Sequence, residues 1–191
     1  MQGIFQKENT DKALKYGIYR HLPTYEKIIR NLVSFYTKKF TATEFHIDMK
    51  KKYLDVWGNV KNAQKVIVAI ALAFDNKISI DALELKFSKM IEYLRKEDNV
   101  YVNKVTARQI VLNDGLLADC TFDLSKTEKP FMVIEKYKDN IRKISFKWKC
   151  TDRMIGLIIH MSGTVTVYKT RESIREEEMT AIYDMLLFAG R

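Results

Sequence analysis

The chain is short of the residues that interrupt secondary structure and of those that cross-link it. Its 191 residues include only 2 prolines, 7 glycines and 2 cysteines. Few prolines and glycines predict long regular elements with short connections between them. Cys120 and Cys150 are too few for a disulfide framework, and without a CxxC motif or a Cys/His cluster they predict no zinc site. We therefore interpret both as ordinary buried thiols in a protein of a reducing, intracellular setting.

Long apolar stretches are missing as well. The longest uninterrupted run covers residues 66–74 (VIVAIALAF), which is far shorter than the roughly 20 residues of a membrane-spanning helix. The first residues, MQGIFQKENTDKALK, lack the apolar core of a signal peptide, and no Asn-x-Ser/Thr glycosylation acceptor occurs. The sequence thus predicts an intracellular protein, cytoplasmic or nuclear, that is not secreted and has no transmembrane segment.

Motifs that mark common enzyme classes do not occur either. There is no GxSxG, GxxxxGK[ST], GxGxxG or HExxH, and the three histidines lie far apart in the sequence. His160 follows apolar residues next to a predicted turn, so we interpret it as a partly buried or surface residue and not as a general base. The sequence favours a protein that is not an enzyme, and it predicts neither a cofactor nor a metal.

One set of carboxylates keeps a metal-dependent enzyme open as an alternative. Asp119 and Asp123 share one face of a predicted strand, and Glu135 lies on the next predicted strand. If these strands are neighbours, the three carboxylates can approach one another and hold Mg²⁺. A solvated polar strand face explains the same residues, and we favour that explanation.

Positive charge is what the sequence has in excess. It contains 33 lysines and arginines against 24 aspartates and glutamates, a formal net charge of +9. Seven basic and two acidic residues lie within residues 136–153, and seven basic and three acidic ones lie within residues 38–65, so these two segments account for the whole excess. Charge concentrated in this way favours polyanionic partners, either nucleic acid or an anionic membrane surface.

The first half of the sequence has a helical pattern of apolar residues. In residues 24–40 and 41–57 they recur every three or four positions, and Thr41-Ala-Thr-Glu44 is a capping-box pattern. Residues 59–75 are apolar nearly all round and predict a central buried helix, with a buried strand as the alternative for its apolar run. Another stripe follows Ser79 and ends at Leu94. We therefore predict a helical region over residues 1–97.

From about residue 98 the period of the pattern changes to two. Alternating runs separated by turns such as Asn113-Asp114-Gly115 and Ser162-Gly163 predict an antiparallel β-meander of about six strands, one of them FMVIEKY at residues 131–137. Ser173-Ile-Arg-Glu176 is a second capping box and starts a C-terminal helix. The predicted fold class is α+β, with a helical N-terminal half and with residues 98–191 as an antiparallel sheet plus a C-terminal helix. No flexible linker separates the halves, which favours one packed unit.

The segment RKISFKWKC, residues 142–150, has the sharpest alternation in the sequence. As a strand it places Trp148 among the core residues and Lys143, Lys147 and Lys149 on the opposite face. Lysines at alternate strand positions lie about 6–7 Å apart. Such a row can contact successive phosphates of a nucleic acid, and each contact adds affinity that does not depend on base sequence.

Our leading hypothesis is therefore a non-enzymatic, intracellular nucleic-acid-binding protein that contacts phosphates through basic surface patches, with DNA and RNA both open. The residues predicted to make these contacts come from both basic segments: Arg142, Lys143, Lys147, Lys149, Lys50, Lys51 and Lys52. The lysine-rich, proline-poor composition also suits a viral or mobile-element protein.

Three alternatives stay open beside this hypothesis. A matrix-like viral structural protein would form homo-oligomers and lie against anionic membrane, with Leu157, Ile159 and Met161 exposed for oligomer contacts. A winged helix over residues 59–104 would read DNA, although acidic residues in its recognition helix oppose this. A lysine-rich edge strand that only keeps the sheet from pairing with other sheets is the third.

Overall fold

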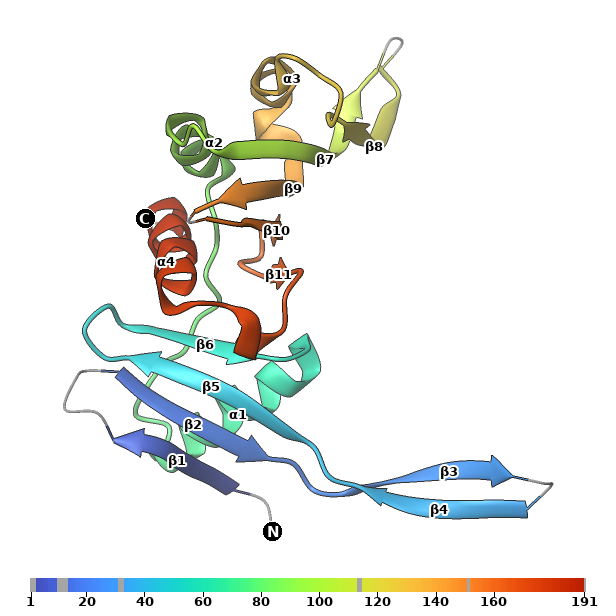
Figure 1. Ribbon diagram of the computed structural model, residues 1–191, viewed down its shortest axis with the longest axis vertical. Coiled ribbons are helices and arrows are strands. Elements are labelled where there is room, and N and C mark those ends of the chain that lie inside the picture. The colour runs from blue at the N-terminus through green and yellow to red at the C-terminus, as the bar shows by residue number, and fades with distance from the viewer. Residues whose placement is uncertain (1–2, 10–13, 31–32, 113–114, 151, 191) are drawn as a thin grey trace. The chain divides into compact units, whose positions relative to one another are not determined.

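The computed structural model describes residues 3–9, 14–30, 33–112, 115–150 and 152–190 (Figure 1). The chain divides into two compact units, residues 1–81 and residues 82–191. Each unit has its own sheet and its own cluster of buried apolar side chains. Among the described residues, no helix is both long enough and apolar enough to cross a membrane.

The first unit consists mainly of strands. In chain order its described elements are β1 (Gly3–Asn9), β2 (Leu14–Arg20), β3 (Thr24–Arg30), β4 (Val33–Lys39), β5 (Ala42–Asp48), β6 (Tyr53–Trp57) and α1 (Val60–Ala73). Four of these strands form an antiparallel sheet in the order β1-β2-β5-β6, whereas β3 and β4 form a separate two-stranded ribbon. Figure 1 shows this ribbon extending away from the sheet between β2 and β5.

A small core lies between the sheet of the first unit and α1. Tyr19 of β2 and Phe45 of β5 are buried together with Val66 and Ile70 of α1. The helix begins after Asn59, whose side-chain oxygen accepts a hydrogen bond of 2.9 Å from the backbone N–H three residues later. The predicted helix over residues 59–75 is therefore confirmed, but the expectation that it is buried is wrong, because Val68 and Leu72 are more than half exposed.

The prediction that the N-terminal half is helical is wrong. Residues 24–40 and 41–57 form β3 to β6 and not two helices, so strands come before helices in this α+β chain. The expected capping box of Thr41 and Glu44 starts no helix, because the chain enters β5 at Ala42 and Glu44 is paired with β2 and β6 on either side. Many residues of these apolar stripes are β-branched or aromatic and fit a strand as well as a helix. Pairing with distant strands decided between the two.

The second unit combines one sheet with three helices among its described residues. In chain order its elements are α2 (Phe87–Lys96), β7 (Val100–Val111), β8 (Leu117–Asp123), α3 (Pro130–Lys136), η2 (Lys138–Asn140), β9 (Ile141–Lys149), β10 (Met154–His160), β11 (Val165–Val167), η3 (Arg171–Ser173) and α4 (Glu176–Gly190). The sheet is antiparallel and has the order β11-β10-β9-β7-β8, so β9 is its central strand.

Helices cover one face of this sheet and bury its apolar side chains. Ile144, Phe146 and Trp148 of β9 belong to the same buried cluster as residues of α2, α3 and α4. The Trp148 side chain is 3% exposed, and its ring lies edge-on to that of Tyr93 in α2, with 6.4 Å between centroids. Lys147 is exposed. The predicted register of this strand, with Trp148 inside and Lys147 outside, is confirmed.

Two parts of the second unit differ from the predicted β-meander. Residues 131–137 lie mostly in helix α3, which starts at Pro130 and buries Ile134 in the core. Proline is well suited to the first position of a helix. A short apolar run fits both a helix and a strand, so the periodicity of these residues could not distinguish the two. In addition, β9 pairs with β7 and not with β8, which breaks the meander order. The hairpin turn with Gly163 at φ 77° and the C-terminal helix α4 are confirmed.

Other turn and helix predictions have mixed outcomes. Asn113 and Asp114 lie outside the described residues. The helical stripe after Ser79 forms a helix only from Phe87 onward, as α2. Just before α2 the backbone makes tertiary hydrogen bonds, since the N–H of Leu85 donates to Met161 O at 3.1 Å. These bonds hold the segment extended beside the sheet.

Candidate nucleic-acid interface

Three of the predicted lysines, Lys143, Lys147 and Lys149, lie on the sheet face opposite the helices of the second unit. Residues that pair directly across antiparallel strands place their side chains on the same face, so the register defines this face. We call it the lysine face, and the following residues form it: Tyr101, Lys104, Thr106, Thr121, Asp123, Lys143, Ser145, Lys147, Lys149, Met154, Gly156, Ile158 and His160. The structure thus brings Lys143, Lys147 and Lys149 together in one row along the central strand.

A transverse row of side chains crosses the middle of the lysine face. Lys147 lies opposite Tyr101 on β7 and opposite Gly156 on β10. Beyond Gly156, the backbone N–H of Tyr168 donates to the Gly156 carbonyl at 3.0 Å. The Tyr168 ring rests on the glycine, since a Cβ at Gly156 would lie 3.0 Å from the ring carbon Cδ2. Lys147 therefore lies between two aromatic residues, of which Tyr101 is 58% and Tyr168 64% exposed.

Sequence reasoning missed both of these tyrosines. Tyr101 alternates with Val100 and Val102, which enter or border the core, and this alternation in the segment NVYVNK was the available signal that its ring points the other way. No local signal identified Tyr168, because its position depends on the pairing of β10 with β11.

Positive charge is concentrated on the central strand of the lysine face. Among the described residues, no carboxylate forms an ion pair with Lys143, Lys147 or Lys149. The acidic side chains of this sheet lie on the edge strand β8, where Asp123 is opposite Lys104. Hydrogen bonds from Ser125, and to a smaller extent the charge of Lys104, hold the pKa of Asp123 below its ordinary value. The lysines of β9 are therefore available to an anionic ligand.

His160 adds a titratable group to the lysine face. It is half-buried, as predicted, and lies opposite Lys143 across the β9–β10 ladder. Burial, and then the positive charge of Lys143, lower the pKa of His160 below its ordinary value. The imidazole is therefore neutral at neutral pH, and it becomes a further cation on this face only in acid.

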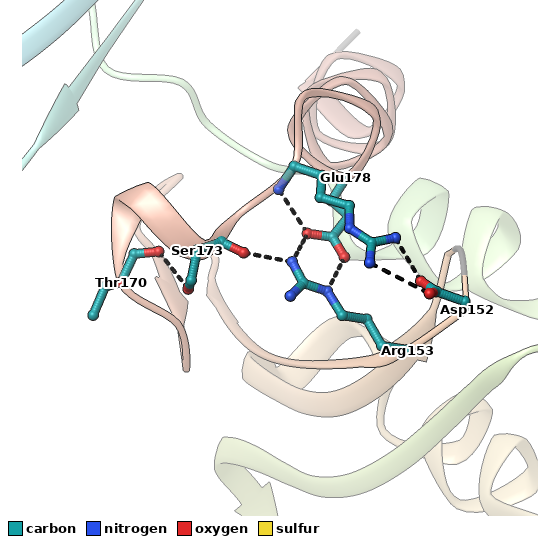
Figure 2. A network of polar contacts seen from close by, with 6 residues as sticks. Asp152, Arg153, Thr170, Ser173 and Glu178 are labelled. Carbon is teal, nitrogen blue, oxygen red and sulfur yellow. Dashed lines mark hydrogen bonds and ion pairs between the residues drawn. The ribbon is translucent and has the colours of Figure 1, made fainter.

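A buried ion pair holds the turn at one end of the lysine face (Figure 2). Arg153 donates from Nε to Oε1 of Glu178 at 2.7 Å and from Nη2 to Oε2 at 2.6 Å. The same Nη2 also donates to the backbone carbonyl of Ser173 at 2.5 Å. Glu178 is fully buried, and the hydrogen bonds from Arg153 lower its pKa in spite of the opposing effect of burial.

The ion pair ties the turn after Lys149 to the start of α4. Glu178, in the first turn of the helix, accepts a hydrogen bond of 2.9 Å from the backbone N–H of Arg175. This is the return half of a capping box with Arg175 at the N-cap. The predicted box of Ser173 and Glu176 is wrong, because Ser173 lies in η3 and its hydroxyl donates to the Thr170 carbonyl. The Arg175 guanidinium donates to both oxygens of Asp152, at 2.6 and 3.3 Å. Asp152 and Arg153 lie between β9 and β10, so these contacts fix the path of the chain next to Lys149.

The remaining predicted contact residues lie apart from this row. Arg142 is an extra residue at a register shift between β7 and β9, and its Nη1 donates to Sδ of Met161 at 2.7 Å. Lys50, Lys51 and Lys52 belong to the first unit and form the turn between β5 and β6. All three are exposed there and make a basic turn of their own. Its backbone is closed by Asp48, whose Oδ1 accepts the N–H groups of the first two lysines at 2.9 and 2.8 Å.

The carboxylates of the metal alternative do not form a site. Asp119 and Asp123 lie on one face of β8, about 13 Å apart at four residues of a strand. Glu135 is on α3, where it accepts hydrogen bonds from Arg95 at 2.9 Å and Lys138 at 2.8 Å. Within the described ranges, no group of three His, Cys, Asp or Glu side chains is placed to hold a metal ion. The alternative in which the three carboxylates approach one another is therefore wrong.

Two other expectations are corrected by burial and by the division of the chain. Leu157 and Ile159 are fully buried in the core, so the expectation that they are exposed is wrong, whereas Met161 is 39% exposed. Residues 59–104 are split between the two units, with α1 in the first and α2 in the second, and do not form one winged helix. Cys120 and Cys150 are free thiols, half-buried and packed against the core.

The chain was compared with known protein families and with curated proteins. No model of a known protein family matches the chain, and no curated protein matches it. Its function is therefore inferred from its own residues and their geometry.

Proposed function

We propose that the protein binds nucleic acid and holds its phosphate backbone with the lysine face. The observation that supports this most is the transverse row in which Lys147 lies between the exposed rings of Tyr101 and Tyr168. Lysine ammonium groups contact phosphates and release counterions, and exposed aromatic rings stack on bases of any sequence. Both contributions favour affinity with little dependence on base sequence.

The dimensions of the lysine row suit a polymeric anion. Lys147 and Lys149 are two residues apart on β9, which corresponds to about 7 Å, and Lys143 is about 13 Å from Lys147 in the other direction. The row therefore spans about 20 Å and reaches more than one phosphate of a strand. A small anion would use only one of these positions.

The place of the row within the sheet argues against a purely protective role. Lysines that keep sheets from pairing edge to edge lie on edge strands. Here they lie on β9, which has β10 on one side and β7 on the other. Edge protection therefore does not explain these lysines, whereas binding of a polyanion does. An intracellular location, in the cytoplasm or the nucleus, is part of this proposal.

The proposal is tested by the salt dependence of binding to labelled oligonucleotides of unrelated sequence. Lys143→Ala, Lys147→Ala and Lys149→Ala should each weaken binding about equally across the sequences. Each should also flatten the plot of log affinity against log salt by about one phosphate contact. Lys129→Ala is the matched control, because Lys129 is exposed just before α3 and its replacement removes the same charge from the helical side.

Two results would contradict the proposal. One is a triple lysine variant that keeps the wild-type affinity and salt slope while the fold is intact. The other is a wild-type protein that binds no oligonucleotide and instead adsorbs to anionic vesicles through the same lysines, which would favour the membrane-associated alternative.

A further inference from the structure

The ribbon formed by β3 and β4 is an arm whose exposed residues need an explanation. Within the described residues, these strands pair only with each other, through a ladder from Thr24 opposite Lys39 to Arg30 opposite Val33. Figure 1 shows the arm leaving the sheet of the first unit between β2 and β5. An isolated two-stranded hairpin is marginally stable at best in water, and it usually needs further strands or a packed helix to bury its apolar side chains. On this arm, large aromatic residues are exposed instead.

One face of the arm carries tyrosines and lysines in a diagonal pattern. Tyr25 lies opposite Lys38, and Lys27 lies opposite Tyr36, so all four side chains share one face. Tyr25 is 68% and Tyr36 69% exposed. At the base of the arm, Nζ of Lys38 lies 5.3 Å from the ring centroid of Phe40, which is also exposed. We call the first four residues the tyrosine–lysine face.

The opposite face of the arm has a different character. Glu26 is the only acidic residue between positions 24 and 40, and it forms an ion pair of 3.4 Å with Lys39. Thr24 and Thr37 lie opposite these two residues and share their face. The one carboxylate of the arm is therefore paired with Lys39 on this opposite face, and the positive charge of the tyrosine–lysine face is left for a ligand.

We propose that the arm is a second contact surface for nucleic acid, with unpaired bases stacked on Tyr25 and Tyr36 and phosphates bound by Lys27 and Lys38. This inference rests on the proposed function only for the class of ligand. The residues of the arm belong to the first unit, whereas the lysine face belongs to the second. Each β-strand of the arm carries an aromatic ring and a cation on this face. These groups are complementary to an unpaired nucleic-acid strand, which presents the π face of a base next to a phosphate.

The chemistry of the tyrosine–lysine face argues against two other occupants. A second copy of the arm would bring lysines against lysines, and it would remove ammonium groups from water without a counter-charge. Base edges in a duplex groove are read by hydrogen bonds, from Arg or Lys to guanine and from Asn or Gln to adenine, and such binding would leave the exposed rings of Tyr25 and Tyr36 without a contact. Unpaired bases with their phosphates match both its rings and its charges.

The test uses the full chain, a labelled 40-nucleotide oligo-dT and a 40-base-pair duplex. The double variant Tyr25→Ala/Tyr36→Ala should bind the oligo-dT about tenfold or more weakly, because two stacking contacts are lost. Tyr25→Phe/Tyr36→Phe keeps the rings and should keep most of the affinity. Thr24→Ala/Thr37→Ala changes the opposite face of the same strands and should have no effect.

A second pair of changes tests the charges without touching the rings. Lys27→Gln/Lys38→Gln should lower the salt slope of oligo-dT binding by about two phosphate contacts. Wild-type affinity in the tyrosine-to-alanine variant, or an equal loss for duplex and oligo-dT, would overturn the stacking assignment. Binding that is lost in the lysine-face variants but unchanged in every arm variant would overturn this inference alone. No binding by the wild-type protein would overturn the proposed function as well.

Discussion

Lys147 on β9 and Tyr101 on β7 lie directly opposite each other, with both side chains on the face of the sheet that the helices leave free. On the other side of Lys147, the missing side chain of Gly156 makes room for the ring of Tyr168. Strand pairing thus places Lys147 next to Tyr101, and the small residue at position 156 lets the Tyr168 ring approach from the other side. Lys147 and Tyr101 lie on strands, and Tyr168 directly follows β11.

A side chain at position 156 should displace the Tyr168 ring although Tyr168 itself is not replaced. A side chain at this position would meet the ring at 3.0 Å, so Gly156→Val should push the ring off the lysine face. Affinity for oligo-dT should then fall several-fold, about as much as in Tyr168→Ala. In a double-mutant cycle measured by fluorescence anisotropy, Gly156→Val and Tyr168→Ala together should lower the affinity no more than either change alone. Additive losses would mean that the glycine and the ring act independently.

Truncation of the buried Trp148 side chain on β9 should lower stability strongly, whereas truncation of its exposed neighbour Lys147 should leave stability nearly unchanged. Trp148→Ala leaves a cavity next to Tyr93 and should lower the free energy of unfolding by about 3–5 kcal/mol. Lys147→Ala should stay within about 0.5 kcal/mol of the wild type. Urea denaturation followed by circular dichroism measures both. A near-neutral Trp148→Ala would contradict the burial of this ring.

The Arg153–Glu178 pair should make stability depend on pH in acid. Hydrogen bonds from Arg153 lower the pKa of Glu178 in the folded state, so the charged carboxylate stabilises the fold above the ordinary glutamate pKa of about 4.3. This contribution is lost as the pH falls through the lowered value. Glu178→Gln should therefore be less stable than the wild type at pH 7, and the difference should narrow toward pH 3. An equal difference at every pH would show that the carboxylate charge is not the cause.

Nucleic-acid binding should strengthen in mild acid through His160. Burial and Lys143 lower its pKa, so the group is neutral at pH 7.5 and gains its proton only below the ordinary histidine value of about 6.5. The new cation lies beside Lys143 and attracts a phosphate. Between pH 7.5 and 5, oligo-dT affinity of the wild type should rise several-fold, and His160→Gln should flatten this rise while keeping the affinity at pH 7.5. An identical pH profile in both proteins would exclude the imidazole from the interface.

The sequence determined the elements whose pattern is strongest locally. The alternation in residues 142–150 placed Trp148 inside and Lys147 outside, because a strand has only two faces and only one of them could bury aromatic side chains. The apolar helix α1 and the C-terminal helix α4 were also identified. The row of lysines could be predicted for the same reason.

Tertiary structure decided everything that depends on distant partners. Residues 24–57 have apolar spacings that fit a helix, yet they became strands because hydrogen bonds to other strands, such as those between β2 and β5, compensated their backbone groups. Tyr101 and Tyr168 are far apart in the sequence, and only the strand order β11-β10-β9-β7 placed them on either side of Lys147. Local periodicity fixes which side of a strand is apolar, whereas the neighbours of that strand are chosen by pairing across the whole unit.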